Sequence, residues 1–304
     1  MRLSDHPMPR HAAVRVSGHF GEFLQGRLGP SGPVALVSVP CAPLQAVLSV
    51  QPSRVFGLHD PMRLLPRDAL RRLGQLLRPL RGGPLRGGAL RGGRLRGRLR
   101  LATNMLPGAG TGASTAALVA VIRYLAPWLA PQEVMRICWQ IEGATDPLAF
   151  VEPAAQLWAS RLGQGLVPLP APPPMRIIGG LWGGPERTDP ADSHFADLCD
   201  LVPQWHGAAQ RGDLPEIARL ASLSAARTAA IRGPTADPTA QIASQLSCLG
   251  YLRAHTGSAR GLILERTAPP AQRQAAHDKL RAAGYGRVME FTLGAMSPQD
   301  GRRE

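Results

Sequence analysis

The chain has 304 residues, which corresponds to about two domains at a typical 150 residues per domain. Hydrophobic residues make up 44% of it, enough to build buried cores without disulfides or a structural metal. Its four cysteines are far apart and form no Cys-x-x-Cys pair, which argues against a zinc ribbon. No apolar run approaches the ~18 residues of a membrane span, and the N-terminus has no signal-peptide core. We therefore expect a soluble, cytoplasmic protein without a membrane partner.

The formal net charge of +14 is concentrated in one segment, because residues 71–100 contain ten arginines and no acidic residue. Within it, residues 79–97 repeat the unit Leu-Arg-Gly-Gly, and the paired glycines oppose a stable helix. No aromatic residue separates the arginines to stack on bases, so we favour a surface insertion over an RNA-binding arm and do not expect a nucleic-acid partner.

Only one lysine, Lys279, is present in the whole chain. A Walker A loop, a protein kinase and a pyridoxal enzyme each need a lysine in a defined motif, and Lys279 lies in none of them. A protein of this composition that binds nucleotide phosphates must do so without an ammonium group.

Strand-like runs and helical spacings alternate along both halves of the chain, which favours an α+β fold. In chain order, we predict strands near 14–16, 34–39, 46–50, 95–101, 176–178, 262–264 and 287–291, and helices near 67–77, 116–125, 131–141, 191–210, 213–231, 237–252 and 270–283. Five prolines within residues 168–174 predict a boundary between a domain over 1–170 and a second over 175–304.

The strongest chemical signal is the glycine-rich stretch from Pro107 to Thr115, which runs from a predicted strand into a predicted helix. Glycines expose backbone amides, and a helix N-terminus attracts an anion, so the stretch predicts a phosphate-binding loop. It also loosely fits a dinucleotide fingerprint, but no second strand ending in an acidic residue follows about 20 residues later. A nucleophile elbow, or glycines that only allow tight strand–helix packing, are the other interpretations.

Two carboxylates follow the loop. Glu142 lies four residues after Cys138 on the inward flank of the helix that begins at Pro131, so it needs a partner or a cation. Asp146 comes just before Pro147, near the end of that helix. The alternatives are a solvated Glu142 and an Asp146 that caps the next turn.

Three segments resemble motifs of the GHMP kinases (galactokinase, homoserine, mevalonate and phosphomevalonate kinases). Residues 106–116 are similar to the Pro-x-x-x-Gly-Leu-Gly-Ser-Ser-Ala motif of that superfamily, residues 18–26 occupy the place of its first motif, and residues 255–261 resemble its C-terminal glycine loop. Residues 18–26, with 33–40 after them, are most similar to one branch, the L-threonine kinases of cobalamin biosynthesis. The resemblance covers nearly the whole chain outside the arginine repeat.

The resemblance implies an N-terminal domain of mixed sheet and helices and a C-terminal α/β sandwich. It also implies ATP and Mg²⁺ as cofactors and L-threonine as the small-molecule substrate, with O-phospho-L-threonine as the product. A kinase for homoserine or another small alcohol is the first alternative. An RNA-binding protein on an inactive kinase scaffold is the second, and a homodimer is left open.

The resemblance also implies roles for individual residues. Asp146 accepts the proton of the substrate hydroxyl, while Ser114 and Glu142 hold Mg²⁺. The residues implied to bind ATP are Pro107, Gly108, Ala109, Gly110, Thr111, Gly112, Ala113, Ser114 and Thr115, and those implied to contact the substrate are His19, Glu22, Gln25, Thr256, Gly257 and Ser258. Many members carry a lysine before the first motif, where this chain has Arg15.

Overall fold

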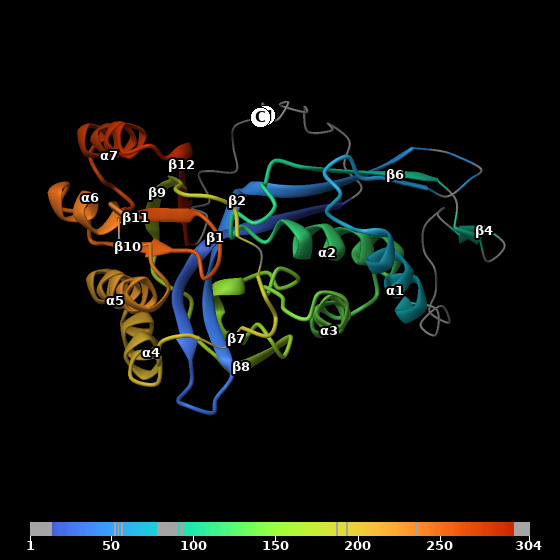
Figure 1. The fold of residues 1–304 in the computed structure, drawn as a ribbon, viewed down its shortest axis with the longest axis horizontal. Coiled ribbons are helices and arrows are strands. Elements are labelled where there is room, and N and C mark those ends of the chain that lie inside the picture. The colour runs from blue at the N-terminus through green and yellow to red at the C-terminus, as the bar shows by residue number, and fades with distance from the viewer. Residues whose placement is uncertain are drawn as a thin grey trace.

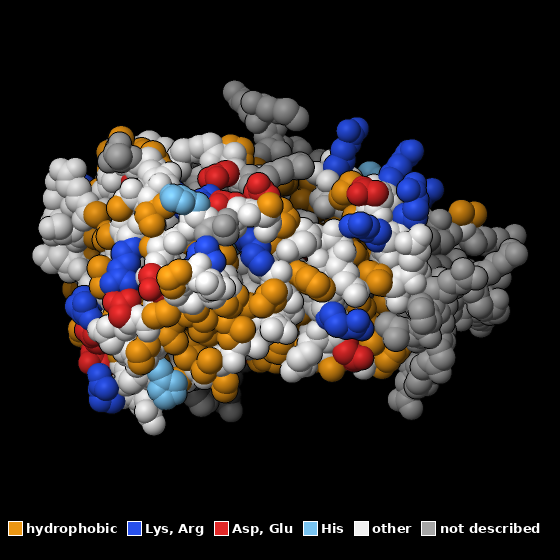
Figure 2. Space-filling view, turned by 60° about the horizontal axis from the view of Figure 1, so that its bottom comes forward, with side chains coloured by type: hydrophobic (Ala, Val, Ile, Leu, Met, Phe, Trp, Pro, Cys, Tyr) orange, Lys and Arg blue, Asp and Glu red, His pale blue; other side chains and the backbone are white. Residues whose placement is uncertain are grey.

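The structure is a computed structural model that describes residues 14–51, 53, 55, 57–77, 90–91, 94–95, 97–186, 188–192, 194–234 and 236–294. Most of the predicted insertion at 79–97 lies outside these residues. Arginine and lysine side chains are spread over the face that Figure 2 shows, at both of its ends. Helix α1 (Arg67–Leu77) exposes Arg67, Arg71 and Arg72. No helix within the described ranges is long and apolar enough to cross a membrane.

A single ten-stranded sheet runs through the molecule in the order β12-β9-β11-β10-β1-β2-β6-β3, with β7 paired to β2 and β8 paired to β7 (Figure 1). Its strands are β1 (Val14–Arg27), β2 (Val34–Gln51), β3 (Gly57–His59), β6 (Arg98–Thr103), β7 (Gln156–Ala159), β8 (Gln164–Pro168), β9 (Met175–Leu181), β10 (Gly250–Arg253), β11 (Ala259–Glu265) and β12 (Gly286–Leu293). A separate short pair is formed by β4 (Leu90–Arg91) and β5 (Arg94–Leu95).

Helices occupy both ends of this sheet (Figure 1). One end carries α1, α2 (Ala113–Leu125) and α3 (Pro131–Glu142), and the other carries α4 (Leu201–Arg211), α5 (Leu214–Arg232), α6 (Thr239–Gln245) and α7 (Pro270–Ala282). A short 3-10 turn at Pro153–Ala155 leads into β7. The mixed α+β architecture is as predicted. The sheet is continuous across the expected boundary, since β1 pairs with β10 through Glu22 and Arg253, so the division into two domains stays a prediction.

The predicted helices at 67–77, 131–141, 213–231 and 270–283 are confirmed to within two residues, and the helix predicted at 116–125 starts earlier, at Ala113. The predicted helix at 191–210 is wrong in its first ten residues, because 196–198 pair with the end of β1: Arg27 N donates to Ala196 O at 2.7 Å and Leu198 N to Arg27 O at 2.8 Å. The predicted helix at 237–252 is wrong beyond Gln245, where β10 forms against β11.

The short runs predicted in the first fifty residues are parts of two long strands, β1 and β2, whose ladder shifts register between Ser17 and Leu24. Residues 18–26 belong to β1. Each register shift within them changes which side chains face which side of the sheet. The main core lies between this sheet and α2, α3, α4 and α5. A smaller core lies under α6 and α7, and alternation along β9 places Ile177 in the first core and Ile178 in the second.

Candidate active site

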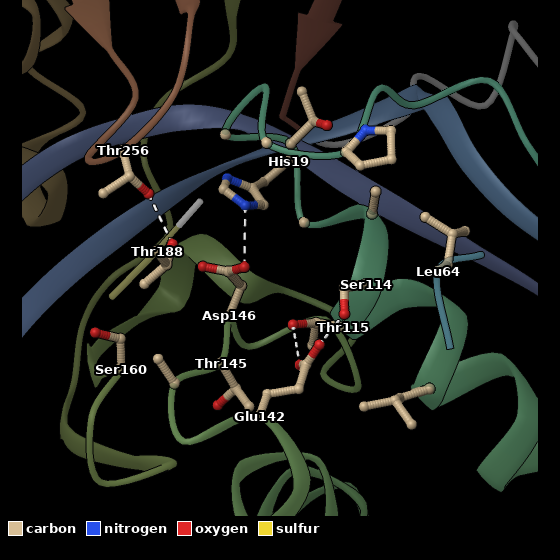
Figure 3. A pocket seen from close by; sticks show the side chains of 18 of the residues that line it. His19, Leu64, Ser114, Thr115, Glu142, Thr145, Asp146, Ser160, Thr188 and Thr256 are labelled. Carbon is tan, nitrogen blue, oxygen red and sulfur yellow. Dashed lines mark hydrogen bonds and ion pairs between the residues drawn. The ribbon is translucent and has the colours of Figure 1, made fainter. Parts of the chain in front are cut away.

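A cavity of about 480 Å³ brings together all three motif segments. Figure 3 shows how its labelled side chains are arranged. Leu64 lies at one end, Ser114, Thr115 and Glu142 come next, His19 and Asp146 lie in the middle, and Ser160, Thr188 and Thr256 lie at the far end. The cavity therefore has an apolar end, a central group of acids and hydroxyls, and a polar end. We call these the Leu64 end, the centre and the Thr188 end.

The phosphate-loop stretch has three backbone carbonyls bonded to backbone N–H groups of β1 and of the residues at the start of β11. Thr111 O accepts from His19 N at 3.2 Å, Gly110 O from Gly21 N at 3.2 Å, and Ala109 O from Ala259 N at 3.0 Å and Ser258 N at 3.1 Å. In a trans peptide the N–H points opposite to the C=O. The amides of Gly110, Thr111 and Gly112 therefore point away from these partners, and all three residues line the cavity.

Alternate glycines of this loop, Gly108, Gly110 and Gly112, have φ of +77°, +73° and +72°. Alternation between left-handed and other backbone conformations produces a concave row of N–H groups that suits an anion. Gly110 also has no room for a side chain, since a Cβ there would lie 2.3 Å from Thr256 O. The loop and the turn before β11 thus fix each other's position.

Helix α2 begins directly after the loop, with Gly112 as its N-cap and no side-chain cap hydrogen bond. Its first N–H to donate along the helix is that of Ala116, to Gly112 O at 2.8 Å. The free N–H groups before Ala116 and the positive end of the helix dipole add to the attraction of the loop for an anion. Because the helix behind them is buried along most of its length, the anion-binding end is held rigidly.

The centre contains Glu142, the last residue of α3, beside two hydroxyl groups of α2. Ser114 Oγ donates to Glu142 Oε1, and Thr115 Oγ1 donates to Glu142 Oε2 at 2.8 Å. Burial raises the pKa of Glu142 to about 7, although both hydroxyls oppose the rise. No cation lies within ion-pair distance of Glu142 in the described part of the chain. The predicted grouping of Ser114 with Glu142 is present in the structure.

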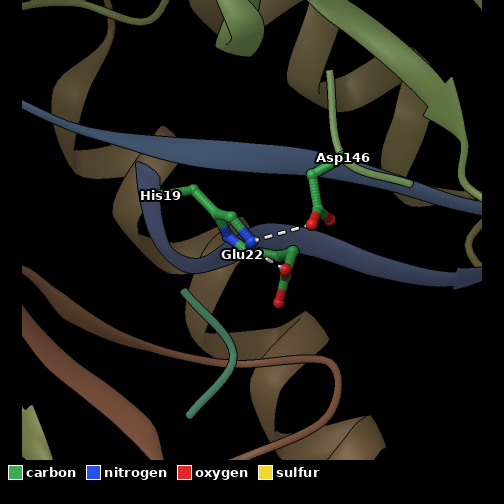
Figure 4. A group of neighbouring side chains, drawn as sticks. All are labelled: His19, Glu22 and Asp146. Atoms are coloured by element: carbon green, nitrogen blue, oxygen red, sulfur yellow. Dashed lines mark ion pairs between the residues drawn. The ribbon is translucent and has the colours of Figure 1, made fainter. Parts of the chain in front are cut away.

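His19 lies between two carboxylates (Figure 4). Its Nε2 is 3.2 Å from Asp146 Oδ2, and its Nδ1 is 3.4 Å from Glu22 Oε1. His19 and Glu22 come from the irregular part of β1, whereas Asp146 follows α3 in the loop before Leu148. The other oxygen of Glu22 accepts the backbone N–H of His255, which ties the first motif to the third.

The charges of this group are set by competition between burial and ion pairing. Burial opposes a charge on His19, but Asp146 and Glu22 outweigh it and raise the pKa of His19 to about 9. Burial likewise opposes a charge on Asp146, and the charged imidazole overcomes it and lowers the pKa of Asp146. Burial raises the pKa of Glu22 to about 7. At neutral pH, His19 and Asp146 form a buried ion pair.

Of the Thr188 end, Thr256 was predicted from the sequence, whereas Ser160, Arg161 and Thr188 were not. Thr188 Oγ1 and Thr256 Oγ1 are 2.7 Å apart, and Ser160 and Arg161 complete this end of the lining. The Leu64 end was missed as well, since its residues 63–66 precede α1 and carry no motif. Side chains of this kind have no pattern along the chain, because they are gathered only by the folding of distant segments.

The remaining predicted residues have different positions. Ala109 is the one predicted loop residue that does not line the cavity, and Gly257 and Ser258 pack behind the loop, where a Cβ on Gly257 would lie 2.5 Å from Gly110 N. Gln25 is fully buried on β1 and donates from Nε2 to Arg253 O at 2.9 Å, away from the cavity lining. Arg15 donates to Gln45 on the neighbouring strand. Direct substrate contacts by Gln25, Gly257 and Ser258 stay predictions.

In sequence, no protein-family model and no curated protein matches the chain. In structure, it is similar to mevalonate kinase from L. major in complex with R-mevalonate, with a TM-score of 0.59 and 16% identity over 92% of this chain and 95% of that one. Homoserine kinase from Cytophaga hutchinsonii gives a TM-score of 0.56 and 15% identity, over 94% of this chain and 96% of that one. A 4-(cytidine 5'-diphospho)-2C-methyl-D-erythritol kinase gives a TM-score of 0.57 and 18% identity, over 93% of this chain and 100% of that one. The chain therefore has the fold of the GHMP kinases.

Proposed function

We propose that this protein is an ATP-dependent kinase that transfers the γ-phosphoryl group to the side-chain hydroxyl of L-threonine. The observation that carries the proposal is that Gly110 to Gly112, whose amides point away from the partners of the loop carbonyls, line a cavity whose centre holds the His19–Asp146 ion pair. An anion-binding backbone and a fixed carboxylate within one cavity are the two parts that phosphoryl transfer to an alcohol needs.

ATP fits the cavity in one direction. The loop amides bind its phosphates, and the base takes the Leu64 end, where Leu64, Leu65 and Leu118 offer apolar surface. The γ-phosphate then points past the centre toward the Thr188 end, which takes the acceptor. The backbone supplies the phosphate site, so the absence of a loop lysine is no obstacle.

The centre suits a magnesium ion. Glu142 and the hydroxyl of Ser114 offer oxygen ligands, which Mg²⁺ prefers, and Glu142 lies half-buried without a cationic partner among the residues described. Glu142 and Ser114 would hold the ion. When bound, it would neutralise charge on the ATP phosphates.

Asp146 receives the proton of the acceptor hydroxyl. The hydroxyl oxygen forms a bond to the γ-phosphorus as the bond from that phosphorus to the β–γ bridging oxygen breaks, and the hydroxyl proton passes to Asp146. Because His19 keeps Asp146 ionised, the carboxylate accepts a hydrogen bond from the hydroxyl and fixes its orientation throughout the approach. ADP leaves with the bridging oxygen.

L-threonine is favoured as the acceptor by the resemblance of residues 18–26 to the L-threonine kinases of cobalamin biosynthesis, in which the product supplies the aminopropanol arm. Two of those residues, His19 and Glu22, line the cavity. The similarity of the fold to homoserine kinase makes L-homoserine the acceptor to test beside it.

The test is an ADP-release assay with purified protein, Mg·ATP and separate acceptors: L-threonine, L-serine, L-homoserine and mevalonate. We expect L-threonine to give the highest kcat/KM, with O-phospho-L-threonine identified by mass and by phosphorus NMR. ADP release that no acceptor stimulates would refute the kinase assignment, and preference for another acceptor would refute L-threonine alone.

The matched control for this assay is Asp146→Asn, which keeps the shape of the side chain and removes its charge. We expect it to bind ATP as the parent does and to lower kcat by about 10²- to 10⁴-fold. Acceptor-dependent ADP release that Asp146→Asn does not reduce would come from a contaminant or from a different base.

A further inference from the structure

Arg161 lies beside Asp146 although 14 residues separate them in the sequence. Thr145 N donates to Ser160 O at 2.9 Å, which fastens the turn between β7 and β8 to the loop after α3. Asp146 and Arg161 are the next residue on each side of this bond, and both line the cavity. The turn thereby places a guanidinium group next to the carboxylate proposed as the proton acceptor.

The hydrogen bonds of Arg161 are to neutral oxygens. Its Nη1 donates to Ser160 Oγ at 3.1 Å, and its Nη2 to the backbone oxygen of Asp189 at 3.2 Å. Within the described ranges, no carboxylate lies within ion-pair distance of this guanidinium, and its Nε has no acceptor. Among the described residues Arg161 is a half-buried cation without an ion pair, although Asp146, Asp192 and Asp189 lie close enough to act on its charge.

A second arginine nearby, Arg232, forms ion pairs with acids, which Arg161 does not do within the described residues. Arg232 lies over the ring of Phe195 at 4.5 Å, and Arg161 lies over the same ring at 5.8 Å. Arg232 is paired with Asp192 at 2.5 Å and with Glu186 at 3.5 Å. Of the two arginines at this ring, Arg161 lines the cavity and Arg232 does not. The acids of this region thus neutralise the arginine outside the cavity lining.

The wall beside Arg161 contains a stacked pair of rings and a neutral imidazole. Phe195 stacks on His255 with ring centroids 4.2 Å apart and 11° between the planes, and His255 Nε2 is 3.5 Å from Arg161 Nη2. Burial, with Arg161 and Arg232 adding to it, lowers the pKa of His255 to about 3, so the imidazole is neutral. Thr188 and Thr256 add hydroxyl groups. The Thr188 end therefore combines a guanidinium that has no ion pair among the described residues with neutral donors, and Glu186, which pairs with Arg232, lies in the same lining.

We infer that Arg161 binds a carboxylate group of the acceptor, so that the enzyme selects hydroxy acids, including hydroxy amino acids, over neutral alcohols. The inference rests on the proposed function and adds a specificity-determining residue to it. A partly desolvated guanidinium is best satisfied by a carboxylate, to which it can donate two parallel hydrogen bonds. Because Asp146 is adjacent, a carboxylate held by Arg161 brings the acceptor's hydroxyl toward Asp146.

The experiment compares each acid with its neutral amide, which has nearly the same shape: L-threonine with L-threoninamide, and L-homoserine with L-homoserine amide. The assays use the full chain with Mg·ATP, for the parent and for Arg161→Gln, Arg161→Lys and Arg219→Gln. Arg219 is the matched control, because it is an exposed arginine of α5 that pairs with Glu216 outside the cavity lining.

For the parent, we expect kcat/KM for the acid to exceed that for the amide by about 10- to 100-fold, as expected for a hydrogen-bonded charged group. Arg161→Gln should remove most of this ratio by lowering the value for the acid while leaving that for the amide and the KM for ATP nearly unchanged. Arg161→Lys should recover part of the ratio, and Arg219→Gln should retain all of it.

Two results would overturn the inference while the kinase assignment stands: equal use of acid and amide by the parent, or equal losses for both in Arg161→Gln. Calorimetric titration of L-threonine and L-threoninamide into the parent protein gives a readout without turnover. Equal affinity there, or binding of neither compound, also overturns it, whereas failure of every acceptor to stimulate ADP release refutes the proposed function itself.

Discussion

His19 Nε2 lies 3.2 Å from Asp146 Oδ2, so a histidine of β1 and an aspartate of the loop after α3 form an ion pair inside the cavity. Burial alone would favour the neutral form of each residue. The mutual attraction is large enough to reverse this, raising the pKa of His19 to about 9 and lowering that of Asp146. The pair keeps a buried carboxylate ionised at neutral pH without a lysine.

Replacing His19 with asparagine should change the pH dependence of turnover. In the parent, kcat should fall as the pH rises through about 9, where His19 loses its proton. In His19→Asn, burial is no longer opposed by the imidazolium, so the pKa of Asp146 should rise and the acidic limb should move to higher pH. A profile of kcat against pH for both proteins tests this, and superimposable profiles would contradict it.

The same ion pair has a predictable effect on stability. The folded-state pKa of His19 lies above its ordinary value of 6.5, so its contribution to the free energy of unfolding is fully present below pH 6.5 and is lost as the pH rises through about 9. Denaturant unfolding at a series of pH values should show this loss in the parent and a smaller one in His19→Asn.

Removing the hydroxyl of Ser114 should weaken the use of magnesium. In Ser114→Ala, Glu142 keeps its bond from Thr115, but the centre loses one oxygen donor. We expect the Mg²⁺ concentration for half-maximal activity, at fixed ATP, to rise by roughly 10-fold or more. Ser49→Ala removes a serine hydroxyl on β2 outside the cavity lining and is the control. An unchanged magnesium titration for Ser114→Ala would exclude it from the metal site.

Adding one methyl group to the loop should abolish nucleotide binding. A Cβ at Gly110, where φ is +73°, would lie 2.3 Å from Thr256 O, so the loop and the turn before β11 would have to separate. Gly212 has φ of +67° with nothing within 4 Å, so Gly212→Ala carries only the cost of a left-handed backbone, about 1 to 2 kcal/mol. Fluorescence titration with ATP should show binding by Gly212→Ala and none by Gly110→Ala. Normal binding by Gly110→Ala would show that the loop does not hold the phosphates.

Deleting residues 79–94 should leave the kinase intact. Of the described residues between Ala69 and Leu106, none lines the cavity, so we expect L-threonine turnover within about twofold of the parent value. A protein that binds RNA through its arginines would instead lose an affinity that depends steeply on salt. Loss of such RNA affinity, with no L-threonine kinase activity in the parent, would favour the binding protein on an inactive scaffold.

Several local features of this chain follow from its sequence. The periodicity of residues 131–141 and the proline and glutamate at its start predict α3, and the glycines before residue 113 predict a phosphate loop leading into a buried helix. These predictions hold because the backbone conformation there depends on neighbours within a few positions. Residues 196–198 and 250–252 were predicted as helix, and they form sheet pairs because distant strands offer better hydrogen-bond partners.

The sequence by itself determined the glycine-rich loop that leads into α2, the absence of a lysine from any nucleotide motif, and the two acids at and after the end of α3. Only the tertiary structure decided that His19 pairs with Asp146, that Gln25 is buried away from the cavity, and that Arg161 lies near Asp146 without an ion pair among the described residues. The physical reason is that helices and glycine turns are governed by short-range backbone preferences. Ion pairs and charges without an ion pair depend instead on which distant segments meet. Here the register shifts of β1 and the packing of the β7–β8 turn bring those segments together.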